Sequence, residues 1–163
     1  HEIADYYKRE CDGFQNSWLM RTAATIGIRE TRRLDGMYTL TKEDIISNRK
    51  FDDSIALGCW PIDVHPPKGK SGMHEMYVPL PYQIPFRALL PRKIENLLVA
   101  GRCISTEREA MGTIRVGATC GAIGHAAGVA AALSAKSGTN LQSLDVHNLQ
   151  KELVNQNAVI GDV

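Results

Sequence analysis

The segment Asn96–Gly128, NLLVAGRCISTEREAMGTIRVGATCGAIGHAAG, decides the fold. It begins with an apolar run, Leu97–Ala100, that predicts a buried strand ending at Gly101 and Arg102. A polar stretch then leads into a run of glycine, alanine and cysteine that predicts a helix. A strand that ends on glycine, beside a helix without bulky side chains, indicates a backbone that closes on a flat or anionic ligand.

This helix is predicted over Thr119–Lys136, with Gly138 as its C-cap glycine. Each glycine inside a helix costs roughly 1 kcal/mol relative to alanine, so several of them call for a physical reason. Two interpretations stay open: tight packing on a sheet, or an anion at the helix start, where free N–H groups attract negative charge. The spacing is not the GxGxxG of a dinucleotide site. The glycines are Gly117, Gly121, Gly124 and Gly128.

Composition narrows the class of protein. A chain of 163 residues is expected to form one domain or two small lobes, and its net charge of +1 gives no electrostatic argument for binding nucleic acid or membrane. No apolar run reaches the ~18 residues of a membrane span. The four cysteines form no CxxC pair and no zinc spacing, so free thiols and no metal site are expected.

The first half of the chain reads as short elements. Periodicity predicts a helix over Glu2–Cys11, and a turn signal at Asp35-Gly36 predicts a hairpin over Ile26–Leu40. Thr41 is expected to cap a short helix over Lys42–Ser47, with an acid three residues after the cap.

The remaining elements are extended segments, a loop and a last helix. Ser54–Val64 reads as extended, and Pro66–Gly72 as a flexible loop. The prolines of Met76–Phe86 favour an edge strand or an extended arm, because proline donates no ladder hydrogen bond. Asp145 is expected to cap a helix over Val146–Asn155.

Two groups of residues outside the glycine-rich segment are candidates for chemistry. On a strand, Arg29 and Arg33 share one face and Arg32 takes the other, so a pair of guanidiniums can hold a carboxylate. Asp63 and His65 alternate on an extended segment, and histidine titrates near neutral pH. For both groups, a solvated surface stays open as the alternative.

Four stretches resemble bacterial FAD-dependent oxidoreductases, which belong to the flavoprotein superfamily of fumarate reductases and glutathione reductases. The resemblance covers about Ile26 to Leu153 and keeps order and spacing. The stretches are IRETRRLDGMYTLTKEDI, FDDSIALGCWPIDVH, YQIPFRALLPRKIENLLVAGRCIS and REAMGTIRVGATCGAIGHAAGVAAAL.

The resemblance implies a truncated α+β fold in two parts. Residues 1–92 would be the later half of a substrate domain with a mixed or antiparallel sheet. Residues 93–163 would supply the last strand and the glycine-rich helix of an FAD-binding domain. His65, Arg29 and Arg32 would serve catalysis on the substrate side. The residues expected beside the flavin are Ala100, Gly101, Arg102, Arg115, Gly117, Ala118 and Thr119.

The family's amino-terminal GxGxxG, which holds the FAD pyrophosphate, is absent from this sequence. The resemblance therefore implies that the chain is the C-terminal portion of a flavoenzyme and holds no FAD by itself. Its partners would be the missing N-terminal half, a small-molecule substrate and possible further copies of the chain. The alternative is a non-catalytic assembly module that uses the Gly/Ala helix as a packing surface.

Overall fold

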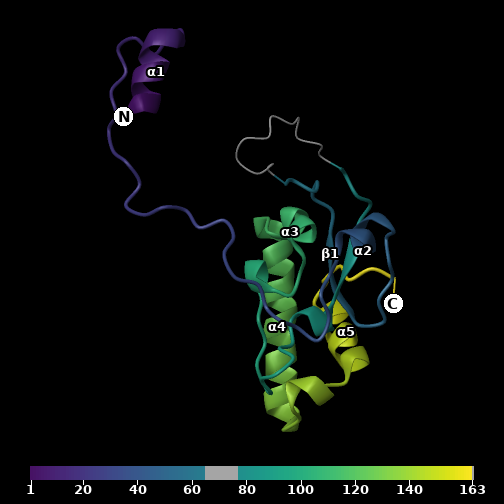
Figure 1. The fold of residues 1–163 in the computed structure, drawn as a ribbon. Helices are drawn as coiled ribbons and strands as arrows, with labels where there is room; N and C mark the ends of the chain where they lie inside the picture. Colours follow the sequence, from purple (N-terminus) through teal and green to yellow (C-terminus); the bar gives the residue numbers. More distant parts are fainter. Residues whose placement is uncertain (65–76, 163) are drawn as a thin grey trace.

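The computed structural model describes residues 1–64 and 77–162 and has an α+β fold, as the sequence predicts. Five helices, a two-stranded sheet and three 3-10 turns follow one another along these residues (Figure 1). The loop predicted at Pro66–Gly72 lies outside the described residues. The elements are α1 (Glu2–Glu10), α2 (Lys42–Ile46), β1 (Ser54–Gly58), β2 (Tyr82–Pro85), η1 (Phe86–Ala88), η2 (Gly101–Cys103), α3 (Arg108–Ile114), α4 (Gly117–Ser137), η3 (Leu141–Ser143) and α5 (Val146–Asn155).

The sheet at the centre of the core is a single antiparallel pair, β1 and β2. Ser54 lies opposite Pro85 and Gly58 lies opposite Tyr82, with an irregularity in the register after Ser54. A two-stranded sheet offers proline an edge position, which agrees with the edge strand predicted around residue 82. Every residue of β2 is buried, so the strand is covered on both faces.

Helix α4 lies along the sheet and is the longest element, as predicted (Figure 1). It contacts β1, α5 and η2. Its row of Ile123, Ala126 and Ala130 is fully buried, and Gly138 ends it in the left-handed conformation with φ 67°. By length and composition α4 could also cross a membrane, a test that the core helices of soluble proteins pass as well.

The C-terminal residues are tied to the sheet by buried side-chain hydrogen bonds. Gln150 of α5 donates to the carbonyls of Asp52 and Ser54, at 2.6 and 3.1 Å. The Ser54 hydroxyl donates in turn to the carbonyl of Ile160 at 2.6 Å. Asp145 accepts from two backbone N–H groups at the start of α5, so the predicted cap is confirmed.

The strand predicted at Leu97–Ala100 does not form. The segment makes no ladder, and Leu97 is 42% exposed. Its backbone reaches the core once, where Val99 N–H donates to the carbonyl of Leu89 at 2.9 Å. A buried parallel strand needs neighbours along its edges, and none of the described residues provides one.

The hairpin predicted over Ile26–Leu40 is also wrong. The residues after its expected turn pair with distant partners: Gly36 with Pro91, and Leu40 with Thr106. Gly36 does not take the positive φ that a tight hairpin turn needs, and a Cβ there would lie 2.6 Å from Ser105 Cβ. The glycine therefore allows a close approach between distant segments.

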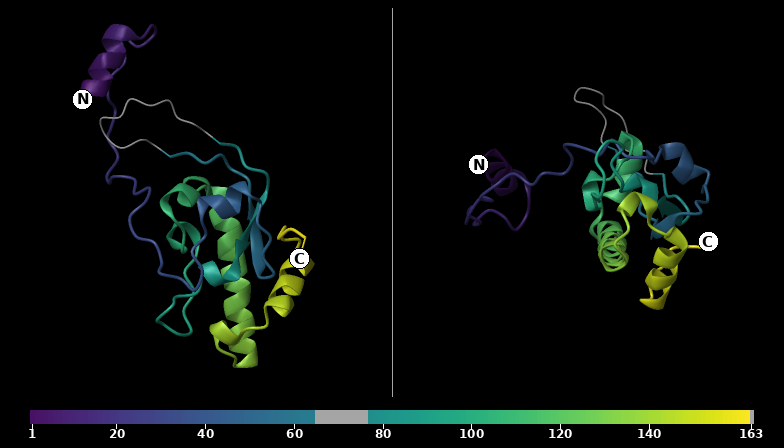
Figure 2. Two further views of the ribbon diagram at one scale, coloured as in Figure 1. Left: turned by 45° about the vertical axis from the view of Figure 1, so that its right-hand side comes forward. Right: turned by 90° about the horizontal axis from the view of Figure 1, so that it is seen from below.

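The amino-terminal segment stands apart from the body. Helix α1 forms as predicted but buries no residue, and Figure 2 shows it separated from the core in both views. Figure 1 shows that an extended stretch joins it to the rest. The segment exposes several large apolar side chains, among them Ile3, Tyr6, Trp18 and Met20. Helix α1 and the extended stretch after it, residues 1–29, are called the arm; its helix buries no residue against the rest of the described chain.

The predicted cap of α2 is present as a capping box. Asp44 accepts from the Thr41 backbone N–H at 3.0 Å and from the Tyr38 hydroxyl at 2.8 Å. Burial alone would raise the pKa of Asp44, but these hydrogen bonds favour the carboxylate and the net pKa is lowered. Burial, and next the bond to Asp44, raise the pKa of Tyr38 to about 12.

The free energy of unfolding is expected to fall as pH rises from about 10 to about 12. Tyr38 has a folded-state pKa of about 12 against an ordinary value of 10.0, so its contribution is present below pH 10 and is lost above it. Burial raises the pKa of Tyr82 in the same direction. Urea denaturation across this range measures the slope. Tyr38→Phe should reduce it, and an unchanged slope would contradict the assignment.

Candidate functional site

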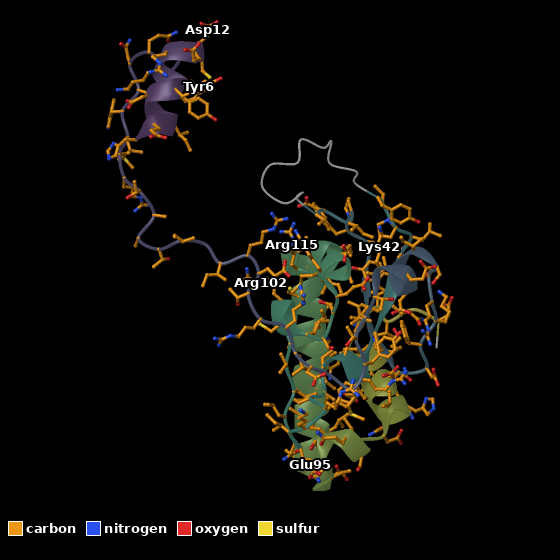
Figure 3. The ribbon with its side chains drawn as sticks, viewed as in Figure 1. Tyr6, Asp12, Lys42, Glu95, Arg102 and Arg115 are labelled. Atoms are coloured by element: carbon orange, nitrogen blue, oxygen red, sulfur yellow. The ribbon has the colours of Figure 1, made fainter. Side chains whose placement is uncertain are left out.

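The turn η2 contacts α4, and Figure 3 shows its Arg102 near the end of the helix that Arg115 precedes. Gly101 opens this turn with φ 75°, a conformation that other residues rarely adopt, and Ala100 precedes it in an extended conformation. Burial raises the pKa of the Cys120 thiol in the first turn of α4, and the charge of Arg102 opposes that rise. The structure therefore brings the Gly101-Arg102 pair to the start of α4, although the strand expected before it does not form.

The start of α4 carries unpaired backbone donors. Val116, its N-cap, offers no side-chain hydrogen bond. The N–H groups of Gly117, Ala118 and Thr119 have no hydrogen-bond partner among the residues described. Gly117 and Ala118 are exposed. Three N–H groups at the positive end of a 21-residue helix form a suitable surface for hydrogen-bond acceptors or negative charge.

One face of α4 is open along its glycines. A Cβ built at Gly117, Gly121, Gly124 or Gly128 meets no atom within 4 Å in the described part of the chain. Tight packing of these glycines on the sheet is therefore not observed, because the helix turns Ile123, Ala126 and Ala130 to the core instead. We call the four glycines the open glycine face. Its glycines lower the stability of the helix, and within residues 1–64 and 77–162 no close contact offsets that loss.

A second group forms around Asp63. Its carboxylate Oδ2 accepts from Arg115 Nη2 at 2.5 Å and from Arg29 Nη2 at 3.2 Å. The same two nitrogens approach the Asp63 carbonyl, at 3.2 and 3.4 Å. The side chain of Arg115 is 16% exposed and that of Arg29 is 44% exposed. One carboxylate thus holds two guanidiniums from distant parts of the chain.

These three side chains line a cavity of about 160 Å³, the Asp63 cavity. Helix α3 forms another wall, where Gly112 lets the backbone of Asp63 and Val64 cross closely. A Cβ on Gly112 would lie 3.0 Å from the Asp63 carbonyl oxygen and 3.1 Å from Val64 Cγ2. The described lining consists of Arg29, Glu30, Asp63, Val64, Arg108, Gly112 and Arg115.

Residues Ile28 and Arg29 connect the start of α4 with the group around Asp63. Arg102 donates from Nη1 to the carbonyl of Ile28 at 2.5 Å, and the next residue, Arg29, contacts Asp63. Arg115 and Arg102 lie at the same end of α4, where the arm reaches the body (Figure 3). Arg115, expected beside the flavin, turns its guanidinium to Asp63.

The other predicted catalytic residues are not assembled there. Arg32 is exposed and its side chain makes no hydrogen bond or ion pair with the residues that the structure describes, whereas Arg33 pairs with Glu30. His65 lies outside the described residues. Gly112 and Arg108 also line the cavity, and neither is among the site residues predicted from the sequence. The glycine inside REAMGTI was the available signal, since a helical glycine marks a close approach.

Comparison with known proteins identifies the family. The family model described as FAD dependent oxidoreductase matches residues 1–153. The chain belongs to this family. No curated protein and no solved structure matches the chain. Membership of an FAD-dependent oxidoreductase family implies that FAD is the cofactor of the full-length protein.

The start of α4 fits such a group. The flavin ring is flat and carries hydrogen-bond acceptors on its pyrimidine edge. Unpaired N–H groups at Gly117–Thr119 offer matching donors, and the absent Cβ atoms of Gly117 and Gly121 leave room for a flat ring. Arg102 adds a positive charge nearby. These residues would meet the flavin ring and not the FAD pyrophosphate, because this sequence contains no GxGxxG.

Proposed function

We propose that this chain is the C-terminal part of an FAD-dependent oxidoreductase and supplies one wall of its flavin site. The observation that carries the proposal is the start of α4, where three unpaired N–H groups and the open glycine face lie beside Gly101 and Arg102. In this proposal residues 93–163 belong to the FAD-binding domain and residues 1–92 to the substrate domain.

FAD, when bound, accepts or donates the hydride or electrons of the reaction. The chain's residues position it and shape its electrostatic surroundings. The N–H groups of Gly117, Ala118 and Thr119 donate hydrogen bonds to its acceptor edge, and the positive end of α4 stabilises negative charge there. Arg102, held by the Ile28 carbonyl, adds a cation on the same side.

The substrate side of the proposed site is the Asp63 cavity. Arg29 and Arg115 orient the substrate, and the Ile28–Arg29 backbone brings the cavity next to the flavin wall. His65 follows Val64 of the cavity lining in sequence and is proposed to move a proton. In the flavin-containing enzyme, His65→Ala is therefore expected to slow reduction of the flavin by substrate.

Flavin content tests the proposal. The isolated chain is expected to carry no flavin, and the longer flavin-containing protein is expected to lose flavin when Gly117 is replaced by valine. A valine there places methyl groups where the ring would lie. Ala135→Val, at an exposed site near the far end of the same helix, is the matched control. Visible flavin absorbance per protein is measured. Equal flavin in both variants would remove the start of α4 from the site.

The open glycine face also supports a second candidate, a non-catalytic assembly module. Four glycines without neighbours in the described part of the chain offer a second polypeptide a close approach along most of α4. Sedimentation of the chain with and without its proposed N-terminal half separates the two candidates. A stable complex that carries no flavin would favour assembly over catalysis, and self-association of the chain alone would favour a homo-oligomer.

A further inference from the structure

We infer that the Asp63 cavity binds a small monocarboxylate, held by Arg29 and Arg115. This names the substrate class of the proposed flavoenzyme and rests on that proposal for its role in catalysis. The two arginines proposed to hold it both lie within the described residues.

The charges of the three central side chains do not cancel. Arg29 and Arg115 together carry two positive charges, and Asp63, which both contact, carries one negative charge. The acid beside them, Glu30, contacts Arg33. The trio therefore keeps one net positive charge at a partly enclosed site, where a bound anion is attracted more strongly than in bulk water.

The hydrogen-bonding capacity of the guanidiniums is only partly used. Each of the two arginines donates to Asp63 through Nη2 alone. Their Nε and Nη1 donors have no partner among the described residues. Asp63 thus holds each guanidinium through Nη2. The Nε and Nη1 groups of each arginine stay available to donate to a second acceptor. A planar carboxylate suits these N–H groups, because it accepts two parallel hydrogen bonds.

Size and charge restrict the ligand further. The cavity of about 160 Å³ is comparable to one of 150 Å³ that accepts benzene. Val64 and the glycine surface of α3 add an apolar wall for a short carbon chain. The trio's surplus of one positive charge equals the single negative charge of a monocarboxylate, and Arg108, the third arginine of the lining, has an interaction of its own. Inorganic phosphate carries more than one negative charge at pH 7 and matches this surplus less well.

Calorimetric titration of the flavin-free chain with propionate tests the inference. We expect saturable binding, no binding of the neutral isostere propionamide, and weaker binding of inorganic phosphate. Arg115→Gln should raise the Kd for propionate about tenfold or more, the effect of losing a charge-assisted hydrogen bond. Arg29→Gln, at a more exposed site that folding tolerates, should act in the same direction. Arg21→Gln removes an equal charge from an exposed position of the arm and should change nothing.

Equal binding of propionate and propionamide, or unchanged binding in both cavity variants, would overturn the inference. Tighter binding of phosphate would overturn the assignment to carboxylates. Circular dichroism of each variant confirms that it is folded. Because no flavin enters the titration, its outcome is independent of the flavin-content experiment: the cavity can bind propionate even if the start of α4 proves not to hold FAD, and the reverse also holds.

Discussion

Replacing Gly58 by alanine is expected to lower the free energy of unfolding by about 3 kcal/mol. Gly58 ends β1, and a Cβ at this position would lie 2.3 Å from the hydroxyl oxygen of Tyr82 and 2.4 Å from its Cζ. Tyr82 is 1% exposed, so its ring cannot swing into solvent. Its hydroxyl lies 2.9 Å from Thr113 Oγ1, and Thr113 donates to the carbonyl of Trp60. Moving the ring breaks this buried network.

Urea denaturation of the variant measures the loss, and two comparisons identify its cause. Gly121→Ala introduces the same methyl group in open space on α4 and should stabilise the chain by about 0.5–1 kcal/mol. In a Tyr82→Leu background most of the penalty of Gly58→Ala should disappear, because the ring that the methyl group meets is gone. Additive penalties in the double variant would contradict the steric explanation.

Replacing Gly112 by valine is expected to cost about 2 kcal/mol and to abolish carboxylate binding in the Asp63 cavity. The new Cβ would lie 3.0 Å from the Asp63 carbonyl oxygen and 3.2 Å from its carbonyl carbon, which are backbone atoms with little freedom to move. The Asp63 segment must therefore lift away from α3. This movement separates the carboxylate from Arg115, whose Nη2 now lies 2.5 Å from Oδ2.

Gly121→Val makes the same exchange at a position on α4 where a Cβ meets no atom of the described chain within 4 Å, and it serves as the control. It should gain a few tenths of a kcal/mol from helix propensity and leave propionate binding unchanged. Gly112→Ala should fall between the wild type and Gly112→Val in both stability and binding. Propionate binding that survives in Gly112→Val would show that the crossing of Asp63 over α3 does not position the cavity.

The sequence predicted the elements whose signals are local. The box at Thr41 and Asp44, the cap at Asp145 and the ending at Gly138 each depend on hydrogen bonds or φ angles within a few residues. These helices were placed to within a few residues for that reason. The hairpin at Asp35-Gly36 used an equally local signal and was wrong, because Gly36 serves a contact with Ser105 across 69 residues.

In the candidate site, too, the residue types could be predicted from the sequence but their contacts could not. The sequence alone singled out Arg29, Asp63 and Arg115, but it assigned them to three separate motifs, because side-chain chemistry is readable residue by residue. Only the tertiary structure showed that one carboxylate joins the two arginines, 34 and 52 positions away from it. Such a meeting depends on how α3 crosses the Asp63 segment, and that crossing follows from packing around Gly112.

The glycine-rich helix itself was determined by its sequence; which of its faces is buried was not. Composition and the C-cap fix a helix with many glycines, since these are local properties of the chain. Which face of the helix turns to the core depends on the packing of Ile123 against apolar side chains of other elements. The fold buries the row of Ile123, Ala126 and Ala130 and leaves the open glycine face without a neighbour among the described residues.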